Sequence, residues 1–180
     1  AWQAQGVPPV ITSVNVSARQ FRQDNVVAMI EEVLRETGLE PNLLEVELTE
    51  SALMQDADQF VSMLGKLSDL GVLISLDDFG TGYSNLSYLK RFPVDRLKVD
   101  KSFVRDITND ADDATIVRTI IALGHNLGLK VVAEGVETEQ QVAFLLDNDC
   151  DELQGNYFGR PMDVQDLVPL LRGTKPILKA

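Results

Sequence analysis

The chain has 180 residues, of which 44% are hydrophobic and 24% charged, and its formal net charge is −12. This composition is typical of one globular domain with a sizeable core. The negative charge argues against a nucleic-acid polymer or an anionic membrane surface as partner, because both require a basic face.

Short β-branched runs alternate along the chain with segments of helical spacing. A first strand is predicted over 10–17 and a helix over 24–38, with Asp24 as its N-cap and Gly38 just past its end. The following pairs are strand 43–50 with helix 57–71, strand 72–78 with a short helix over 84–92, and strand 96–100 with helix 113–128. Strand 130–136 precedes a helix that opens at the capping box of Thr138 and Gln141, and the weaker strand 152–158 precedes helix 164–173.

These six strand–helix units predict an α/β fold with a parallel sheet covered by helices. No GxGxxG follows the first strand, which disfavours a dinucleotide-binding sheet. A closed (β/α)8 barrel takes about 250 residues and eight units. We therefore expect a single domain over 1–180 with a TIM-like (β/α) barrel fold, truncated at the N-terminus, in which about six of eight units are present. The alternative is a complete open sheet of six strands.

Polar residues fall near the C-terminal end of every predicted strand. In a barrel these ends surround one mouth, where active sites lie. Strand ends are also close to solvent, so each polar residue has an ordinary explanation when it is taken alone. The residues are Asn15, Glu47, Asp77, Asp78, Lys98, Asp100, Glu134 and Gln154.

The chemistry of this set favours a magnesium or manganese site. Asn15, Glu47, Asp77 and Asp78 offer hard oxygen ligands without Cys or His, and divalent cations would keep the adjacent aspartates ionised. A carboxylate that bridges two ions would make the site a two-metal hydrolytic centre.

Lys98 could stabilise charge on a phosphoryl oxygen, and Glu134 could accept a proton from water. A salt bridge between these two residues across the mouth is the structural alternative. The loop with Gly80 and Gly82 is expected to be a mobile segment that carries Asp78, with a plain tight turn as the alternative.

The single Cys150 rules out a disulfide within the chain and fits a cytoplasmic domain. We expect Cys150 to be a buried small residue and the lone His125 to be a half-exposed helix residue, so zinc chemistry is disfavoured.

Several segments together resemble the EAL family of cyclic di-GMP phosphodiesterases. They are NVSARQF, VELTES, LDDFGTGYSNLSYLKRFPVDRLKVDKSFV, VVAEGVET and CDELQGNYFGRPM, and the resemblance runs from about residue 10 to 163. It implies a TIM-barrel-like fold and hydrolysis of cyclic di-GMP to linear pGpG with Mg²⁺ or Mn²⁺, with Ca²⁺ as an inhibitor. It also implies bacterial second-messenger signalling, a homodimer, and a parent protein with sensory, GGDEF-type or membrane-anchoring parts.

The resemblance also implies roles for single residues. Asn15, Glu47 and Asp77 look like metal ligands, Asp78 looks like the ligand of a second metal, Lys98 resembles the lysine that contacts the catalytic water, and Glu134 resembles the base. Asp78, Asp100 and Gln154 are assigned to the substrate. Glu50, Gly80, Gly82 and Glu137 are assigned to support of the loops at the mouth, with Glu50 linked to dimerisation.

Two departures from the family pattern stand out. Asn156 lies in GNYF where the family has GYF, for which we expect a small effect on the loop. The Glu-Ala-Leu tripeptide, whose glutamate is a metal ligand, does not occur in these 180 residues. We therefore expect the parent to be a phosphodiesterase and the 180-residue chain alone to be weak or inactive. A non-catalytic receptor for cyclic di-GMP and a dimerisation module are the alternatives.

Overall fold

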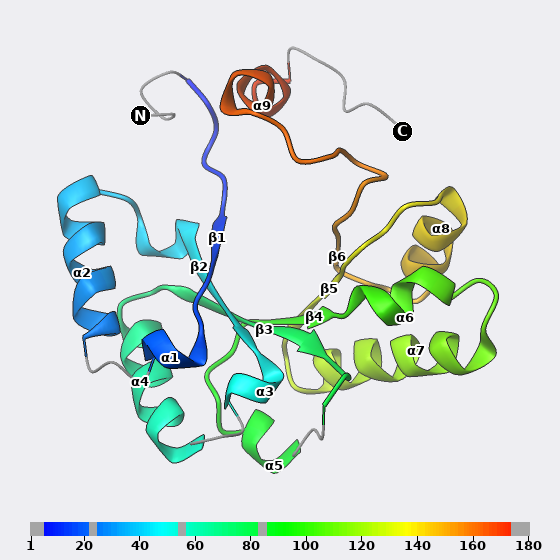
Figure 1. Cartoon of the computed structure of the whole chain (residues 1–180), viewed down its shortest axis with the longest axis horizontal. Helices are drawn as coiled ribbons and strands as arrows, with labels where there is room; N and C mark the ends of the chain where they lie inside the picture. Colours follow the sequence, from blue (N-terminus) through cyan, green and yellow to red (C-terminus); the bar gives the residue numbers. More distant parts are fainter. Residues whose placement is uncertain (1–5, 22–24, 54–56, 83–85, 174–180) are drawn as a thin grey trace.

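Six parallel strands form one sheet in the order β1-β2-β3-β4-β5-β6 (Figure 1). The computed structural model describes residues 6–21, 25–53, 57–82 and 86–173. Each strand lies beside the one before it, so the order never reverses as it does in a doubly wound sheet. The sheet is a partial barrel of the TIM type, as predicted. Its strands are β1 Thr12–Asn15, β2 Leu44–Thr49, β3 Leu73–Phe79, β4 Arg96–Val99, β5 Lys130–Ala133 and β6 Glu152–Leu153.

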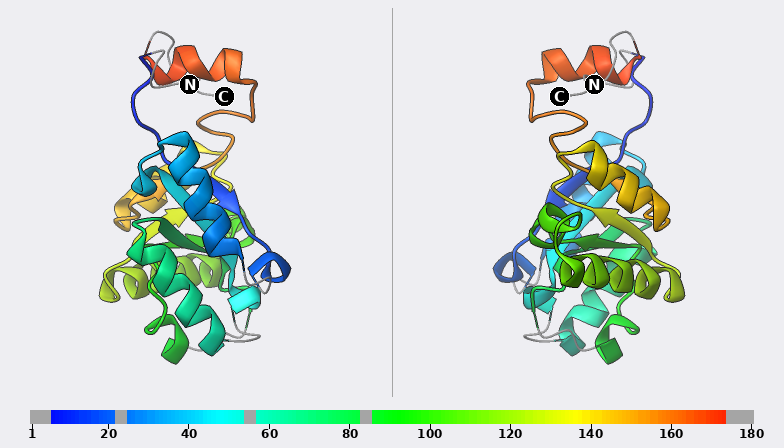
Figure 2. Two further views of the ribbon diagram at one scale, coloured as in Figure 1. Left: turned by 90° about the vertical axis from the view of Figure 1, so that its left-hand side faces the viewer. Right: turned by 90° about the vertical axis from the view of Figure 1, so that its right-hand side faces the viewer.

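The longer helices lie along the outside of the curved sheet, apart from α9, which lies across its open side (Figures 1 and 2). The helices on the outside include α2 Val26–Thr37, α4 Ala57–Asp69, α5 Leu86–Leu89, α7 Ala111–Asn126 and α8 Glu139–Asp147, and α9 is Val164–Leu171. Short helices follow three strand ends, namely α1 Ala18–Phe21, α3 Glu50–Leu53 and α6 Lys101–Asp106, and the 3₁₀ helix Pro41–Leu43 precedes β2.

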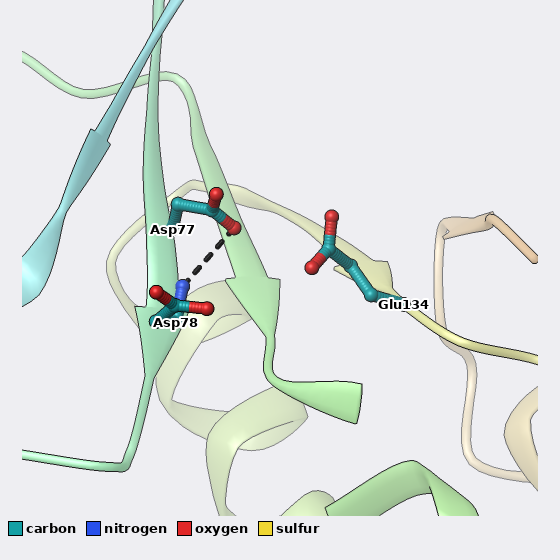
Figure 3. Close-up of side chains that lie close together, drawn as sticks. All are labelled: Asp77, Asp78 and Glu134. Atoms are coloured by element: carbon teal, nitrogen blue, oxygen red, sulfur yellow. Dashed lines mark hydrogen bonds between the residues drawn. The ribbon is translucent and has the colours of Figure 1, made fainter. Parts of the chain in front are cut away.

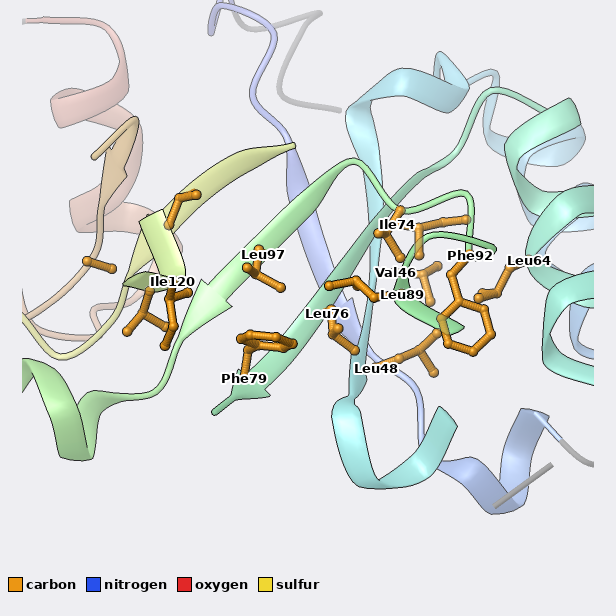
Figure 4. Packing of buried hydrophobic residues seen from close by; sticks show 14 of the residues in the cluster. Val46, Leu48, Leu64, Ile74, Leu76, Phe79, Leu89, Phe92, Leu97 and Ile120 are labelled. Carbon is orange, nitrogen blue, oxygen red and sulfur yellow. The ribbon is translucent and has the colours of Figure 1, made fainter. Parts of the chain in front are cut away.

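The hydrophobic core lies between the sheet and this outer layer of helices (Figure 4). Val46, Leu48, Ile74 and Leu76 point outward from neighbouring strands and are at most 1% exposed, and Leu64 of α4 packs against this layer. Burial of each such side chain contributes about 1.5–3 kcal/mol. The other face of the same strands is polar, so the strands alternate between apolar and charged residues rather than forming the continuous apolar runs of an ordinary parallel sheet.

Most predicted helix ends agree with the structure. Gly38 closes α2 with φ of 65°, and Thr138 and Gln141 form the predicted capping box of α8. Asp24, the predicted N-cap of α2, lies outside the described residues; Asn25 directly precedes the helix and makes no side-chain cap bond. β6 ends at Leu153, well before the predicted limit of 158, because the chain turns at Gly155 to pack on Val136.

Cys150 and His125 occupy the ordinary positions predicted for them. The Cys150 thiol is buried, which raises its pKa to about 11. The His125 side chain on α7 is 38% exposed and lies 2.9 Å from the Asp151 carboxylate. Among the helices of the described ranges, none combines the length and the hydropathy that a transmembrane helix needs.

Candidate active site

The ammonium of Lys98 lies among carboxylates from three other strands or their ends. Lys98 on β4 is 3% exposed, and its Nζ lies 2.6 Å from Glu134, 2.8 Å from Glu47 and 3.2 Å from Asp77. Burial alone would lower the pKa of Lys98, but the hydrogen bonds to Glu134 and Glu47 outweigh it and raise the pKa above its ordinary value. The structure thus contains the salt bridge that was the alternative for Lys98 and Glu134, and it brings Glu47, Asp77, Lys98 and Glu134 together at one place.

A β-bulge near the end of β3 brings the two adjacent aspartates to the same site (Figure 3). Successive side chains of a regular strand point to opposite faces. Here the register with β4 shifts between Leu76 and Phe79, and Asp78 adopts a left-handed backbone with φ of 54°. The Asp78 N–H donates to Asp77 Oδ1 at 3.0 Å. As a result, Asp77, Asp78 and Glu134 each offer a carboxylate oxygen within 4.8 Å of the other two.

Lys98 neutralises only part of the negative charge of these carboxylates. Burial first, then the charge of Asp77 and the hydrogen bond and charge of Asp100, raise the pKa of Asp78. Burial also raises the pKa of Glu134, and Lys98 only partly offsets it. A divalent cation favours the charged form of each, and the all-oxygen donor set suits Mg²⁺ or Mn²⁺. The residues present therefore fit a metal site on their chemistry.

Asn15 and Glu47 continue the site toward the edge of the sheet. They are register partners on β1 and β2, and both line a cavity of about 480 Å³ with Ser17 and Thr49. Asn15 is exposed, whereas Glu47 is 7% exposed and bound to Lys98. Asn15 therefore lies beside the carboxylate cluster rather than within it.

The remaining predicted mouth residues lie on two loops. Asp100 is the N-cap of α6 and accepts the Ser102 N–H at 2.9 Å. Burial would raise the pKa of Asp100, but the hydrogen bonds from Ser102 and Asp78 lower it, so Asp100 is a stable anion beside Asp78. Gln154 is exposed and lines a cleft of about 690 Å³ that reaches α9. Glu137 accepts Asn156 Nδ2 at 3.3 Å, so the unusual Asn156 contacts a predicted support residue.

Glu50 lies beneath the glycine loop, where the resemblance expects it. It is 1% exposed, and its Oε2 accepts the Gly80 N–H at 3.3 Å. Gly80 has φ of 98°, and a Cβ there would lie 3.0 Å from Phe103. The described part of the loop is therefore a tight turn; residues 83–85 lie outside the described ranges, and the predicted mobility stays a prediction.

A second group of ion pairs lies two residues before the first along β2 and β4. The sequence analysis did not predict it. Arg96 is 7% exposed. Its Nη1 donates to the Glu45 carboxylate, and its Nη2 lies 3.0 Å from Glu152 Oε1. Ser13 donates to Glu45 at 2.9 Å. The signal was present in the sequence as polar residues two apart, Glu45 before Glu47 and Arg96 before Lys98, because residues i and i+2 share a face of a strand.

Comparison with known proteins agrees with this geometry. The family model described as EAL domain matches residues 1–161. The bifunctional diguanylate cyclase/cyclic di-GMP phosphodiesterase MucR of Pseudomonas aeruginosa is 50% identical over 156 residues, which is 87% of this chain and 23% of MucR. This chain thus spans about a quarter of the length of that relative.

Solved structures agree as well. The PaMucR phosphodiesterase in complex with c-di-GMP superposes with a TM-score of 0.89 at 48% identity, covering 92% of this chain and 67% of that one. A manganese/cy-diGMP complex of Klebsiella pneumoniae BlrP1 gives a TM-score of 0.81 at 33% identity, covering 89% of this chain and 41% of that one. On its sequence match and its partial-barrel fold, the chain belongs to the EAL domain family.

Proposed function

We propose that this chain supplies most of the active site of a metal-dependent phosphodiesterase, which hydrolyses one bond of cyclic di-GMP to give linear pGpG. The observation that carries the proposal is the cluster of Asp77, Asp78 and Glu134, whose carboxylate oxygens lie within 4.8 Å of one another beside Lys98. MucR, a relative named as a bifunctional diguanylate cyclase/cyclic di-GMP phosphodiesterase, and the c-di-GMP complex of PaMucR support the choice of substrate.

Asp77, Asp78, Glu47 and Asn15 would hold Mg²⁺ or Mn²⁺ ions, two of them in our proposal, with Ca²⁺ acting as an inhibitor. When bound, such ions neutralise phosphate charge and polarise the phosphoryl oxygens and water. The manganese complex of BlrP1 supports a metal of this class.

The chain's own residues orient the substrate and move protons. Lys98 stays protonated because its pKa is raised, and its Nζ can donate to a phosphoryl oxygen or hold a water in exchange for one of its three carboxylate partners. Glu134 accepts a proton better because burial brings its pKa closer to neutrality. Asp100 and Gln154 would contact the nucleotide at the rim, and Glu137 and Glu50 would keep the two mouth loops in place.

The wider setting is also a proposal. We infer a cytoplasmic domain in a longer modular protein with sensory, GGDEF-type or membrane-anchoring parts, working as a homodimer. The 23% share of MucR that the chain covers supports the modular arrangement. The Glu-Ala-Leu tripeptide does not occur in the chain, so we expect weak or no turnover by the 180 residues alone.

Product analysis tests the function. The 180-residue chain and the longer protein that contains it are incubated with cyclic di-GMP and Mn²⁺, and pGpG is measured. We expect pGpG from the longer protein and a much lower rate from the chain. Equal rates would show that no residue outside the chain is needed for turnover, and tight nucleotide binding without any product would favour the receptor.

Asp77→Asn tests the site itself. In the longer protein that contains the chain, we expect this substitution to abolish Mn²⁺ binding and turnover together, because it removes a central carboxylate charge. Asp147→Asn makes the same change on an exposed residue at the far end of α8 and is expected to alter neither. Full activity of Asp77→Asn would exclude Asp77 from the metal site.

A further inference from the structure

The Gln141 side chain joins two loops that carry candidate catalytic residues. Gln141 lies in the first turn of α8 and is 4% exposed. Its Oε1 accepts the N–H groups of Glu137 and Thr138 at 2.7 and 2.9 Å. Its Nε2 donates to the carbonyls of Val104 and Arg105, at 3.2 and 3.1 Å, in the last turn of α6.

The orientation of this amide is fixed by its partners. Two backbone N–H groups require an acceptor and two backbone carbonyls require a donor, so a flipped amide would lose all four bonds. The capping box accounts only for the bonds at the start of α8. The bonds to α6 are additional, and they join helices that begin far apart in the sequence but lie side by side (Figure 1).

Both joined segments lead directly to the site. The loop 134–138 starts at Glu134, which contacts Lys98, and α6 directly follows its N-cap Asp100, the anion beside Asp78. The loop also lies directly against α6, because a Cβ on Gly135 would lie 2.6 Å from Lys101 Cβ.

The other side of the same loop is held by main-chain contacts. Val136 is fully buried, its N–H donates to the Gln154 carbonyl at 3.0 Å, and its own carbonyl accepts the Tyr157 N–H at 3.0 Å. The Gly155 turn rests on Val136 on this side of the loop, and the Gln141 side chain ties the loop to α6 on the other.

We propose that Gln141 is a positioning residue, which sets Glu134 relative to Asp78 and Asp100 through its bridge between loop 134–138 and α6. This inference rests on the proposed metal-dependent function. Partners that orient metal-site carboxylates typically change metal affinity by about 10–100-fold when removed. Since Gln141 acts through the loop backbone, we expect a loss near the lower end of that range.

Gln141→Glu separates the bridge from the helix cap. Glutamate is as good as glutamine in the capping box, so the bonds to the Glu137 and Thr138 amides remain, whereas the two donors to the α6 carbonyls are lost. Thr138→Ala is the matched control, because it removes the side chain that caps the Gln141 N–H at 3.2 Å and leaves the bridge intact. Gln141→Met, of similar length and without polar atoms, is the second variant should a buried carboxylate prevent folding.

The measurement is Mn²⁺ affinity of the 180-residue chain by calorimetry, at a temperature where far-UV circular dichroism shows every variant fully folded. We expect about tenfold weaker binding for Gln141→Glu or Gln141→Met and less than about a twofold change for Thr138→Ala. Amide exchange at Glu137 and Thr138 reports the loop directly and should quicken in Gln141→Met.

The outcomes separate this inference from the proposed function. If the wild-type chain binds Mn²⁺ and the folded Gln141 variants bind it as tightly as Thr138→Ala does, Gln141 has only a structural role and the inference is wrong. If the wild-type chain and the longer protein bind no Mn²⁺, the proposed metal-dependent function itself fails.

Discussion

Replacement of Lys98 by methionine should destabilise the folded chain markedly. The change leaves Glu47, Asp77 and Glu134 without the ammonium that lies within 3.2 Å of each. Removing one partner of a buried ion pair costs about 3–5 kcal/mol. The Asp77 and Glu134 side chains are 14% and 18% exposed, so water solvates part of their uncompensated charge. We therefore expect the free energy of unfolding to fall by about 3 kcal/mol, the lower end of that range.

The pH dependence of this loss has a definite sign. Burial already raises the pKa of Glu134, and loss of Lys98 raises it further. Between the ordinary carboxyl pKa and this raised pKa, Glu134 is protonated in the folded variant but ionised in the unfolded chain. The loss of folding stability is therefore largest above the folded-state pKa of Glu134, and it shrinks as the pH falls through that pKa. In the wild type, the contribution of Lys98 stays complete up to the ordinary lysine pKa of 10.5 and is lost only as the pH rises through the higher folded-state pKa.

Urea unfolding of both chains at several pH values, without divalent ions, measures the effect. Lys130→Met is the matched control: its Nζ lies 3.7 Å from Glu152 with 62% of the side chain exposed, and we expect a change below about 0.5 kcal/mol. A Lys98→Met chain as stable as this control at neutral pH would refute the view that Lys98 neutralises the cluster, and so would a deficit that grows as the pH falls.

Three further substitutions or modifications test the local geometry. Asp78→Ala should be about 1 kcal/mol less stable than Asp78→Gly in urea, because φ of 54° disfavours a Cβ; equal stabilities would contradict a left-handed Asp78. Gly155→Ala should lower the folding stability by about 3 kcal/mol, since its Cβ would lie 2.1 Å from the Val136 carbonyl oxygen. Gly65→Ala in α4 meets no atom within 4 Å and should raise the stability by about 0.5–1 kcal/mol. A melting temperature of Gly155→Ala as high as that of Gly65→Ala would contradict the close contact at Gly155. Cys150, with a pKa of about 11, should resist iodoacetamide at neutral pH until urea unfolds the chain, and fast labelling of the folded chain would show that the thiol is accessible.

The sequence allowed the barrel and its mouth to be predicted because both follow from local patterns. Strand and helix periods identify the six units, and the polar strand ends identify Glu47, Asp77, Lys98 and Glu134 as neighbours. Short helices such as α1 and α6 were missed, since four to six residues show too little periodicity and are stabilised by tertiary contacts.

Other features depend on contacts that no single segment encodes. The bulge at Asp78 arises from the register between β3 and β4, so adjacent aspartates were visible in the sequence but their shared direction was not. The bonds from Gln141 to α6 likewise join residues 36 and 37 positions apart, although the capping box itself could be read from the sequence.

The left-handed backbone at Asp78 has a consequence for ion selectivity. The main chain fixes the Cα–Cβ direction of Asp78, and the Asp78 N–H holds the Asp77 carboxylate beside it, so the separation of the pair is constrained from the backbone. Small ions with strict octahedral geometry tolerate a rigid pair well, whereas ions of larger radius depend on ligands that can spread. Discrimination against large divalent ions would then originate in one peptide unit of β3.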